Sequence, residues 1–255
     1  MDVLITRQKE AHEGSTRMMV RTLKVLLIIG TLFLSAPSYA VNITPEQWSR
    51  LKEGEIIKWL DNIKGTEVKK GVAIGIVNAP PERVWKVIHE NNDFTHFMPR
   101  MLESILISPS VLPEAESLKF DHDTGDPKQL ISLLKKHRVP GFTGTTGYFF
   151  AVLSVPWPAT NRWYILKLED VVTSDRWFQH WSMVMGNLKT NDGSWELTPL
   201  DNGRTLATYT VFADPGGLIP DWIINLGTTQ TLPDVIRSLR KRVKEESRPE
   251  LGNKK

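Results

Sequence analysis

The most informative charged residue in the sequence is Arg162, at the start of an expected strand. Tyr164, Leu166 and Leu168 follow it at alternate positions, and alternate residues of a strand point to the same face of its sheet. If this face is internal, the guanidinium lies at the edge of an apolar space and needs a partner. That partner is either the headgroup or carboxylate of a bound ligand, or an acidic side chain on a neighbouring strand in a structural salt bridge.

A second expected strand, at 177–185, carries large apolar side chains. Alternation places Trp177, Trp181, Met183 and Met185 on one face and His180 on the other. Aromatic and methionine side chains on the inner face of a sheet form either an ordinary core or the wall of an apolar small-molecule site. The two interpretations overlap where core residues are also the cavity wall.

Residue patterns for metal binding and catalysis are weak. The six histidines include no pair at helical ligand spacing, and the chain has no cysteine, so we expect no structural zinc site. Segment 121–126 is similar to a calcium-binding loop, but its glycine comes one position early, and we interpret it as a polar turn that ends in a helix cap at Asp126. Segment 141–147 is glycine-rich but lacks the lysine of a phosphate-binding loop. We therefore predict no metal site, no cofactor and no catalytic residue.

Hydrophobic periodicity, caps and turns indicate the elements that position these side chains. Thr44 and Gln47 form a capping box before a helical stripe that continues to Leu60, and Asp201-Asn202-Gly203 predicts a hairpin turn. Pro233 should kink or restart the C-terminal helical stretch. In chain order we expect helix 44–60, strand 72–77, helix 83–90, a loop or single turn at 91–100, strands 102–107 and 117–122, helix 126–137, strands 148–155, 162–172, 177–185, 194–199 and 204–212, and a long C-terminal helix from 232.

This order predicts an α+β domain in which a curved antiparallel sheet covers one long C-terminal helix and leaves an enclosed apolar space. With 40% hydrophobic residues and no cysteine, the chain is neither a disordered protein nor a disulfide scaffold. A formal net charge of +3 over 255 residues does not indicate a nucleic-acid-binding surface.

Three segments of the chain resemble START lipid-transfer domains, members of the helix-grip superfamily (Bet v 1-like, SRPBCC) that also contains polyketide cyclases. They are Val72 to Ile88, Val155 to Trp163 and Asp214 to Asn225, and the order of motifs covers about residues 44–245. Family members usually have Ser-Asp-Arg-Asp where this chain has Thr160-Asn161-Arg162-Trp163, so the arginine is kept and the flanking carboxylates are absent. The resemblance implies a helix-grip fold, in which a curved antiparallel β-sheet wraps around a long C-terminal α-helix with an internal hydrophobic cavity.

The resemblance also implies a non-enzymatic protein that binds or transfers a lipid or other hydrophobic small molecule, with the C-terminal helix and a loop at 94–100 opening the entrance. One alternative is a polyketide cyclase- or hydrolase-like enzyme for a polycyclic or aromatic substrate, with Arg162, Tyr164 or His180 in acid or base catalysis. Another is an interaction module with a filled core. The residues that we expect to line the ligand site are Trp157, Arg162, Tyr164, Trp181, Met183, Trp195, Tyr209 and Asn225.

The expected helix at Leu130 to Arg138 combines four apolar residues with a basic end that contains Lys135 and Lys136. It either touches an anionic membrane surface transiently, as an element of the cavity mouth, or packs on the domain with a solvated basic end.

The N-terminus has the pattern of an export signal. Arg17, Arg21 and Lys24 precede the apolar run 25–34, and Ser38 and Ala40 are the small residues of a cleavage site. The run is roughly half as long as a membrane-spanning helix, so an uncleaved anchor is the alternative. We expect a signal peptide at 1–40, cleaved after Ala40.

The export signal implies a periplasmic or secreted protein of a Gram-negative bacterium, with the domain at 41–247 and a disordered tail at 248–255. Translation starts at Met1, Met18 or Met19. Residues 1–40 hold five basic and three acidic residues, so their removal leaves a nearly neutral mature chain.

Overall fold

The computed structural model describes residues 42–66, 68–118, 127–216 and 230–247. The chain divides into two units, Met1–Ile43 and Thr44–Lys255, and the second unit is described below. The predicted signal peptide, the polar turn at 121–126, Asn225 and the tail at 248–255 lie outside the described residues.

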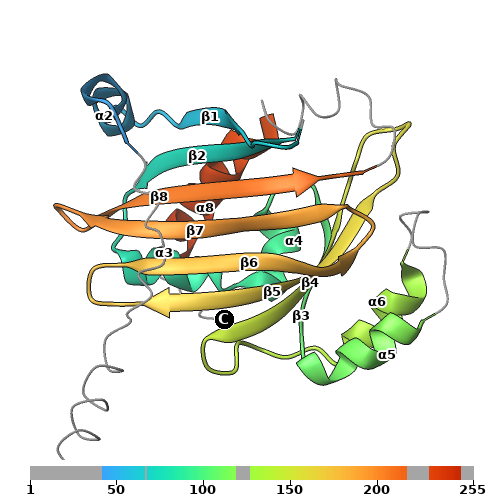
Figure 1. Cartoon of the computed structure of the whole chain (residues 1–255). Coiled ribbons are helices and arrows are strands. Elements are labelled where there is room, and N and C mark those ends of the chain that lie inside the picture. Colours follow the sequence, from blue (N-terminus) through green and yellow to red (C-terminus); the bar gives the residue numbers. More distant parts are fainter. Residues whose placement is uncertain (1–41, 67, 119–126, 217–229, 248–255) are drawn as a thin grey trace, which may run out of the picture. The chain divides into compact units, whose positions relative to one another are not determined.

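Eight strands form one antiparallel sheet in the order β1-β2-β8-β7-β6-β5-β4-β3 (Figure 1). Strands β3 to β8 follow one another in sequence and in space, and β8 pairs with β2 to complete the sheet. The strands are β1 Ile57–Asn62, β2 Lys69–Val77, β3 Met101–Ile107, β4 Thr146–Leu153, β5 Arg162–Val172, β6 Trp177–Gly186, β7 Thr190–Leu200 and β8 Arg204–Asp214.

The described helices lie mostly in the two connections that leave the sheet. The crossover from β2 to β3 carries three short helices, and the connection from β3 to β4 carries three more. The helices are α2 Pro45–Lys52, α3 Pro81–Ile88, η1 Asn91–Asp93, α4 Phe94–Phe97, η2 Pro109–Val111, α5 Leu112–Ser117, α6 Lys128–Lys136 and α8 Leu232–Glu246.

Helix α8 lies against one face of the sheet, which we call the inner face (Figure 1). Its close approach to β2 depends on glycine, because a Cβ at Gly75 would lie 2.6 Å from Cγ2 of Ile236 and 2.8 Å from the Arg240 guanidinium. Pro233 occupies the first turn of α8, where proline is favoured, so it begins the helix rather than kinking it. The arrangement confirms the predicted helix-grip fold.

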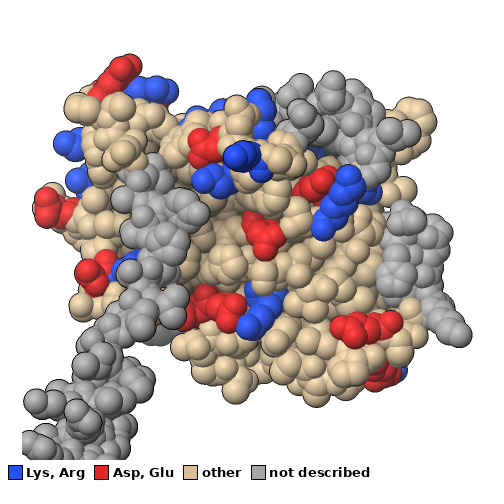
Figure 2. Space-filling view, viewed as in Figure 1, with Lys and Arg blue, Asp and Glu red and all other residues tan. Residues whose placement is uncertain are grey.

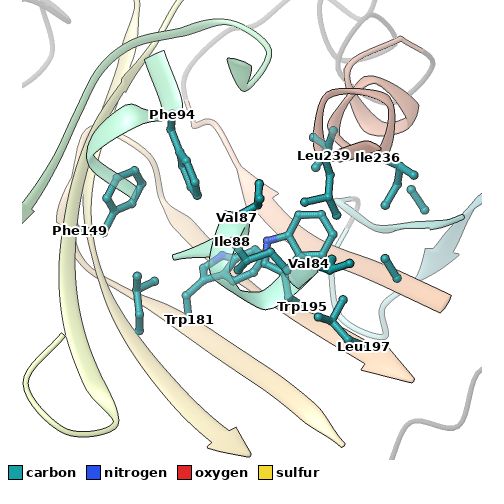
Figure 3. Close-up of a cluster of buried hydrophobic side chains, with 14 of the residues drawn as sticks. Val84, Val87, Ile88, Phe94, Phe149, Trp181, Trp195, Leu197, Ile236 and Leu239 are labelled. Atoms are coloured by element: carbon teal, nitrogen blue, oxygen red, sulfur yellow. The ribbon is translucent and has the colours of Figure 1, made fainter. Parts of the chain in front are cut away.

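Hydrophobic side chains pack on both faces of the sheet. On the inner face, α3, α4 and α8 cover a core that includes Trp195, Leu197 and Leu239 (Figure 3). On the outer face of β3, β4 and β5, helices α5 and α6 cover a second core. Strand β4 serves both, because Phe149 belongs to the inner core and the adjacent Phe150 to the outer one.

The rest of the outer face, which Figure 2 shows, carries exposed charges of both signs. Lys167 pairs with Glu169 at 2.7 Å, and Arg176 pairs with Glu196 at 2.9 Å. Basic and acidic groups are therefore interspersed on this face.

The expected helix at 44–60 is partly wrong. Its capping box is confirmed, because the Thr44 N–H donates to Gln47 Oε1 at 2.9 Å and the Gln47 N–H donates to Thr44 Oγ1 at 3.2 Å. However, α2 ends at Lys52, Gly54 takes a left-handed φ of 94°, and β1 begins at Ile57. The glycine interrupts an apolar spacing that otherwise fits a longer helix.

Three other expectations concern short segments of the chain. Residues 91–97 form η1 and α4, which agrees with the expected loop or single turn. The strand expected at 117–122 is wrong at Ser117, which ends α5, while 119–122 lie outside the described residues. The predicted hairpin turn is confirmed, with Asn202 and Gly203 in the left-handed region that these residue types tolerate best.

Candidate functional site

A cavity of about 360 Å³ lies between the inner face of the sheet and the N-terminal half of α8. At one end it reaches Lys69, an exposed residue at the start of β2, and Pro156 of the loop between β4 and β5. At the other end it reaches Asn91 and Gln179, which are both buried. We call these ends the mouth and the closed end.

Arg162 lies at the mouth and is 9% exposed. Its Nε donates to the Pro215 carbonyl at 3.0 Å, and its Nη1 donates to the carbonyl and the hydroxyl of Thr160 at 2.8 and 2.9 Å. These acceptors hold the guanidinium in place where β5 begins. The alternation predicted from the sequence is confirmed, since Tyr164 and Leu166 line the cavity further along the same strand.

The cavity extends along β5 from Arg162 to Leu168, six residues further on. At a rise of about 3.3 Å per residue, these two positions are roughly 20 Å apart. For a volume of about 360 Å³ this length means that the cavity is narrow and elongated.

Aromatic rings form the middle of the wall, on three neighbouring strands. The Tyr209 ring lies 5.5 Å from the Trp181 ring and 4.8 Å from the Trp195 ring, centroid to centroid. Trp181 Nε1 donates to Asn191 Oδ1 at 3.2 Å, which satisfies the indole N–H. Figure 3 shows Trp181 and Trp195 in the inner core with Val84, Val87 and Ile88 of α3.

Two buried hydroxyls face this part of the molecule. Burial raises the pKa of Tyr164, the nearby Tyr209 raises it further, and a hydrogen bond with Asn191 partly opposes the shift. Burial also raises the pKa of Tyr209. Both hydroxyls are therefore protonated at neutral pH and present neutral polar groups in an apolar wall.

Five of the eight predicted site residues line the cavity: Arg162, Tyr164, Trp181, Trp195 and Tyr209. Met183 packs against the inner core but is not among the described residues that line the cavity. Asn225 lies outside the described residues.

Trp157 does not line the cavity and is 87% exposed. It belongs to the irregular loop between β4 and β5, where alternation no longer determines the direction of a side chain. The lining from this loop comes instead from Ser154, Val155 and Pro156.

Met185 does not share a face with Trp181 and Met183, contrary to the expectation from alternation. A register shift occurs where Ile165 pairs with Met185 and Leu166 pairs with Met183. Strand β6 therefore has one extra residue at this point, a β-bulge, and Met185 points to the outer core as a result. His180 is exposed, which confirms that it lies opposite to the buried Trp181.

The closed end contains polar residues that the sequence analysis missed. Gln179 donates from Nε2 to Asp170 Oδ1 at 3.0 Å, and Asp170 Oδ2 lies 2.7 Å from His89 Nε2. His89 Nδ1 lies 2.9 Å from the Trp85 carbonyl oxygen. Gln179 has the same parity as Trp177 and Trp181, so the alternation argument could have identified it.

The basic helix α6 packs on the outer core, away from the cavity. Leu130 and Leu134 are fully buried there, and Lys135 pairs with Glu103 at 3.0 Å. None of the described cavity-lining residues belongs to α6, which agrees with the alternative in which this helix packs on the domain with a solvated basic end. The described helices include none long and apolar enough to cross a membrane. Within the same residues, no three His, Asp or Glu side chains gather as metal ligands.

Comparisons with solved structures agree with this fold. The chain is similar to a STAR-related lipid transfer protein (fragment 25–204) from Xanthomonas axonopodis, at a TM-score of 0.55 and 22% identity over 74% of this chain and 93% of that one. It is also similar to human STARD10, at a TM-score of 0.54 and 12% identity over 74% of this chain and 69% of that one. At these identities the likeness shows the fold alone.

Comparison of sequences gives a relative and a family model, and the model identifies the family. The chain is 26% identical over 113 residues to an uncharacterized protein of Pseudomonas aeruginosa, covering 38% of this chain and 53% of the relative, so it spans about half the length of the curated relative that it matches. Residues 77–240 match a family model described as polyketide cyclase / dehydrase and lipid transport. That match covers more than half of the chain, and the protein therefore belongs to the polyketide cyclase / dehydrase and lipid transport family.

Proposed function

We propose that this chain is an exported protein that binds or transfers a lipid or another hydrophobic small molecule. The observation that carries the proposal is the cavity of about 360 Å³, with its aromatic and mainly apolar wall. Its volume lies within the range of about 300–1,000 Å³ that is usual for small-molecule sites. The family description and the name of the Xanthomonas relative include lipid transport and lipid transfer.

The driving force for binding is the removal of apolar ligand surface from water. At about 25 cal/mol per Å², a ligand that buries about 200 Å² gains roughly 5 kcal/mol before the cost of its immobilisation. No reacting group is needed for this mechanism, which requires only that the wall excludes water.

Native mass spectrometry of protein purified from bacterial cells tests the proposal. We expect a mass above that of the polypeptide, and loss of the difference after solvent extraction. Val211→Trp should fill the cavity and abolish the extra mass, because Val211 lines it. Val171→Trp is the matched control, because Val171 is exposed on β5. A bare polypeptide mass, together with no binding of a fluorescent fatty acid, would overturn the proposal.

Export is tested by cell fractionation and N-terminal sequencing. The signal at residues 1–40 should direct the chain to the periplasm, where its first residue should be Val41. Charges at Leu27 and Ile28 should retain the chain in the cytoplasm, because they interrupt the apolar run. A wild-type chain that stays in the membrane at full length would support the uncleaved anchor instead.

Transfer also requires contact with a membrane, and α6 is not the element that we propose for it. Its apolar residues Leu130 and Leu134 are buried in the outer core. Lys136→Glu and Arg138→Glu should therefore leave binding to anionic liposomes unchanged. A clear loss of binding would restore the membrane-contact interpretation of this helix.

A further inference from the structure

We propose that the closed end of the cavity is a hydrogen-bonding subsite, in which Asn91 Oδ1 accepts a hydrogen bond from a hydroxyl or N–H group of the ligand. The ligand would then be an amphiphile that enters with this donor group first. The inference rests on the proposed function, because it requires a small molecule in the cavity.

The evidence is an unsatisfied acceptor in the cavity wall. Asn91 is 2% exposed and lines the cavity, and its Oδ1 is buried without a hydrogen-bonding partner among the described residues. A buried amide oxygen without a partner is unfavourable, so such an atom calls for an explanation. Its Nδ2 donates to the Ile88 carbonyl at 3.4 Å, a long hydrogen bond, so little is lost when the amide turns toward a ligand.

Neighbouring polar groups are already engaged with one another. Hydrogen bonds link Gln179 to Asp170, Asp170 to His89, and His89 to the Trp85 carbonyl. His89 is two residues before Asn91 in the sequence. Phe94 and Leu168 complete this end of the cavity with apolar surface. Among the described residues, Asn91 Oδ1 is the buried side-chain oxygen or nitrogen without a hydrogen-bonding partner.

The closed end offers a hydrogen-bond acceptor with partial negative charge, and this determines which chemical group of the ligand can bind there. An amide oxygen attracts an O–H or N–H hydrogen and repels a carboxylate, and the Asp170 carboxyl group lies at the same end. An acidic headgroup is therefore excluded from the closed end and would be accommodated near the basic residues that line the rest of the cavity, Lys69, Arg100 and Arg162. Along β5, Arg162 is roughly 20 Å from the closed end. A neutral alcohol, phenol or amine on an apolar body fits the closed end.

The test compares 2-naphthol with its methyl ether, 2-methoxynaphthalene, which keeps the ring system and the oxygen but replaces the O–H donor with a methyl group, by isothermal titration calorimetry at pH 7. We expect the wild-type protein to bind 2-naphthol roughly tenfold more tightly, the usual effect of one neutral hydrogen bond. In Asn91→Leu the ratio should fall to about one, and the ether should bind at least as tightly as before. Asn78→Leu, at an exposed asparagine before α3, is the matched control and should keep the wild-type ratio.

The outcomes separate this subsite from the proposed function. Equal affinity of the wild-type protein for the two probes overturns the subsite and leaves hydrophobic binding intact, whereas binding of neither probe overturns both. If circular dichroism shows that Asn91→Leu is unfolded, the ratio of the wild-type protein's affinities for the two probes still tests the proposal. A second measurement is the NMR signal of the Asn91 side-chain amide, which should shift with 2-naphthol more than with the ether, and equal shifts would contradict the proposal.

Discussion

The cavity wall depends on a residue without a side chain as much as on its aromatic rings. Gly193 of β7 lies directly opposite Trp181 of β6. A Cβ at this position would collide with the Trp181 indole and with the Thr210 carbonyl oxygen. The bare backbone at Gly193 therefore allows Trp181 to approach the sheet and leaves the space in front of the ring open.

We expect Gly193→Ala to push Trp181 into the cavity. The free energy of unfolding should fall by about 1–3 kcal/mol, as for other overpacked interiors, and a bulky ligand should lose more affinity than a slender one. Urea unfolding and titration with two probes of different width measure these effects. Gly141→Ala is the control, because a Cβ at Gly141 has no atom within 4 Å. Equal behaviour of the two variants would contradict this role of Gly193.

The buried tyrosines should make the fold sensitive to alkaline pH. An unfolded tyrosine ionises near pH 10, whereas burial raises the pKa of Tyr164 and Tyr209 in the folded state. Above pH 10 the folded state therefore holds the extra protons, and stability falls by about 1.4 kcal/mol per pH unit for each tyrosine. Urea unfolding between about pH 9 and 11 should show this decline, and Tyr209→Phe should reduce its slope. If stability declined with pH as steeply in Tyr209→Phe as in the wild-type protein, the raised pKa of Tyr209 would be contradicted.

Among the elements, α8 is held unevenly along its length. In its C-terminal half, Arg240 donates to the Ile76 carbonyl at 2.9 Å and to the Gly54 carbonyl at 2.8 Å, and Arg242 pairs with Glu90 at 2.6 Å. At its N-terminal end, Arg100 donates to the Thr231 hydroxyl at 3.3 Å. Among the described residues, this end of α8 has fewer polar contacts with the rest of the domain, and it lines the cavity, so we expect it to open more readily than the C-terminal half.

Removal of the Arg240 guanidinium should loosen α8 from the sheet. Arg240→Met leaves the carbonyls of Ile76 and Gly54 without their donor, and we expect a loss of about 2 kcal/mol in the free energy of unfolding. Arg237→Met on the same helix should cost less than about 0.5 kcal/mol, because Arg237 is exposed and pairs with exposed Asp234. Hydrogen exchange of the α8 amides provides a second measurement. Similar losses in both variants would contradict the anchoring role.

Regular elements explain why much of the site could be predicted from the sequence. Along β5, alternation from Arg162 to Leu168 is uninterrupted, so the inner face follows directly from the order of the residues. The capping box at Thr44 and the turn at Asn202 and Gly203 are equally local, since the interacting atoms are within a few residues of one another.

The failures occur where longer-range geometry intervenes. The bulge that turns Met185 outward depends on how β6 pairs with β5, which a single strand cannot show. Trp157 lies in a loop whose course depends on contacts such as the Val155 N–H donating to Asn161 Oδ1 at 3.2 Å. Asn91 lies in one turn of η1, and its burial arises only when the crossover packs on the sheet.

In the domain as a whole, stability and binding depend on different cores. The outer core beneath α5 and α6 is separate from the cavity, and its side chains include the fully buried Leu134 and Phe150. The inner core is filled around Ile236 and Leu239 and hollow where Leu232 and Val235 line the cavity. Substitutions in the two cores should therefore have separable effects.

We expect Leu134→Ala to reduce the free energy of unfolding by about 2–5 kcal/mol and to leave ligand affinity unchanged. Leu188→Ala should reduce ligand affinity and leave the free energy of unfolding nearly unchanged, because Leu188 is only half-buried and lines the cavity. Urea unfolding and calorimetric titration of both variants measure the four values. A matching loss of affinity in Leu134→Ala would show that the two cores are coupled.

The outer core also bears on the ligand-free state that the proposed function includes. In that state the hollow inner core contributes least to the stability of the fold. Leu130, Leu134, Phe150 and Trp163 belong to the outer core and do not line the cavity, so we expect their packing to be the same with and without a ligand. The fold should then persist without a tightly bound ligand, and dissociation of the ligand should not expose the chain to unfolding or proteolysis.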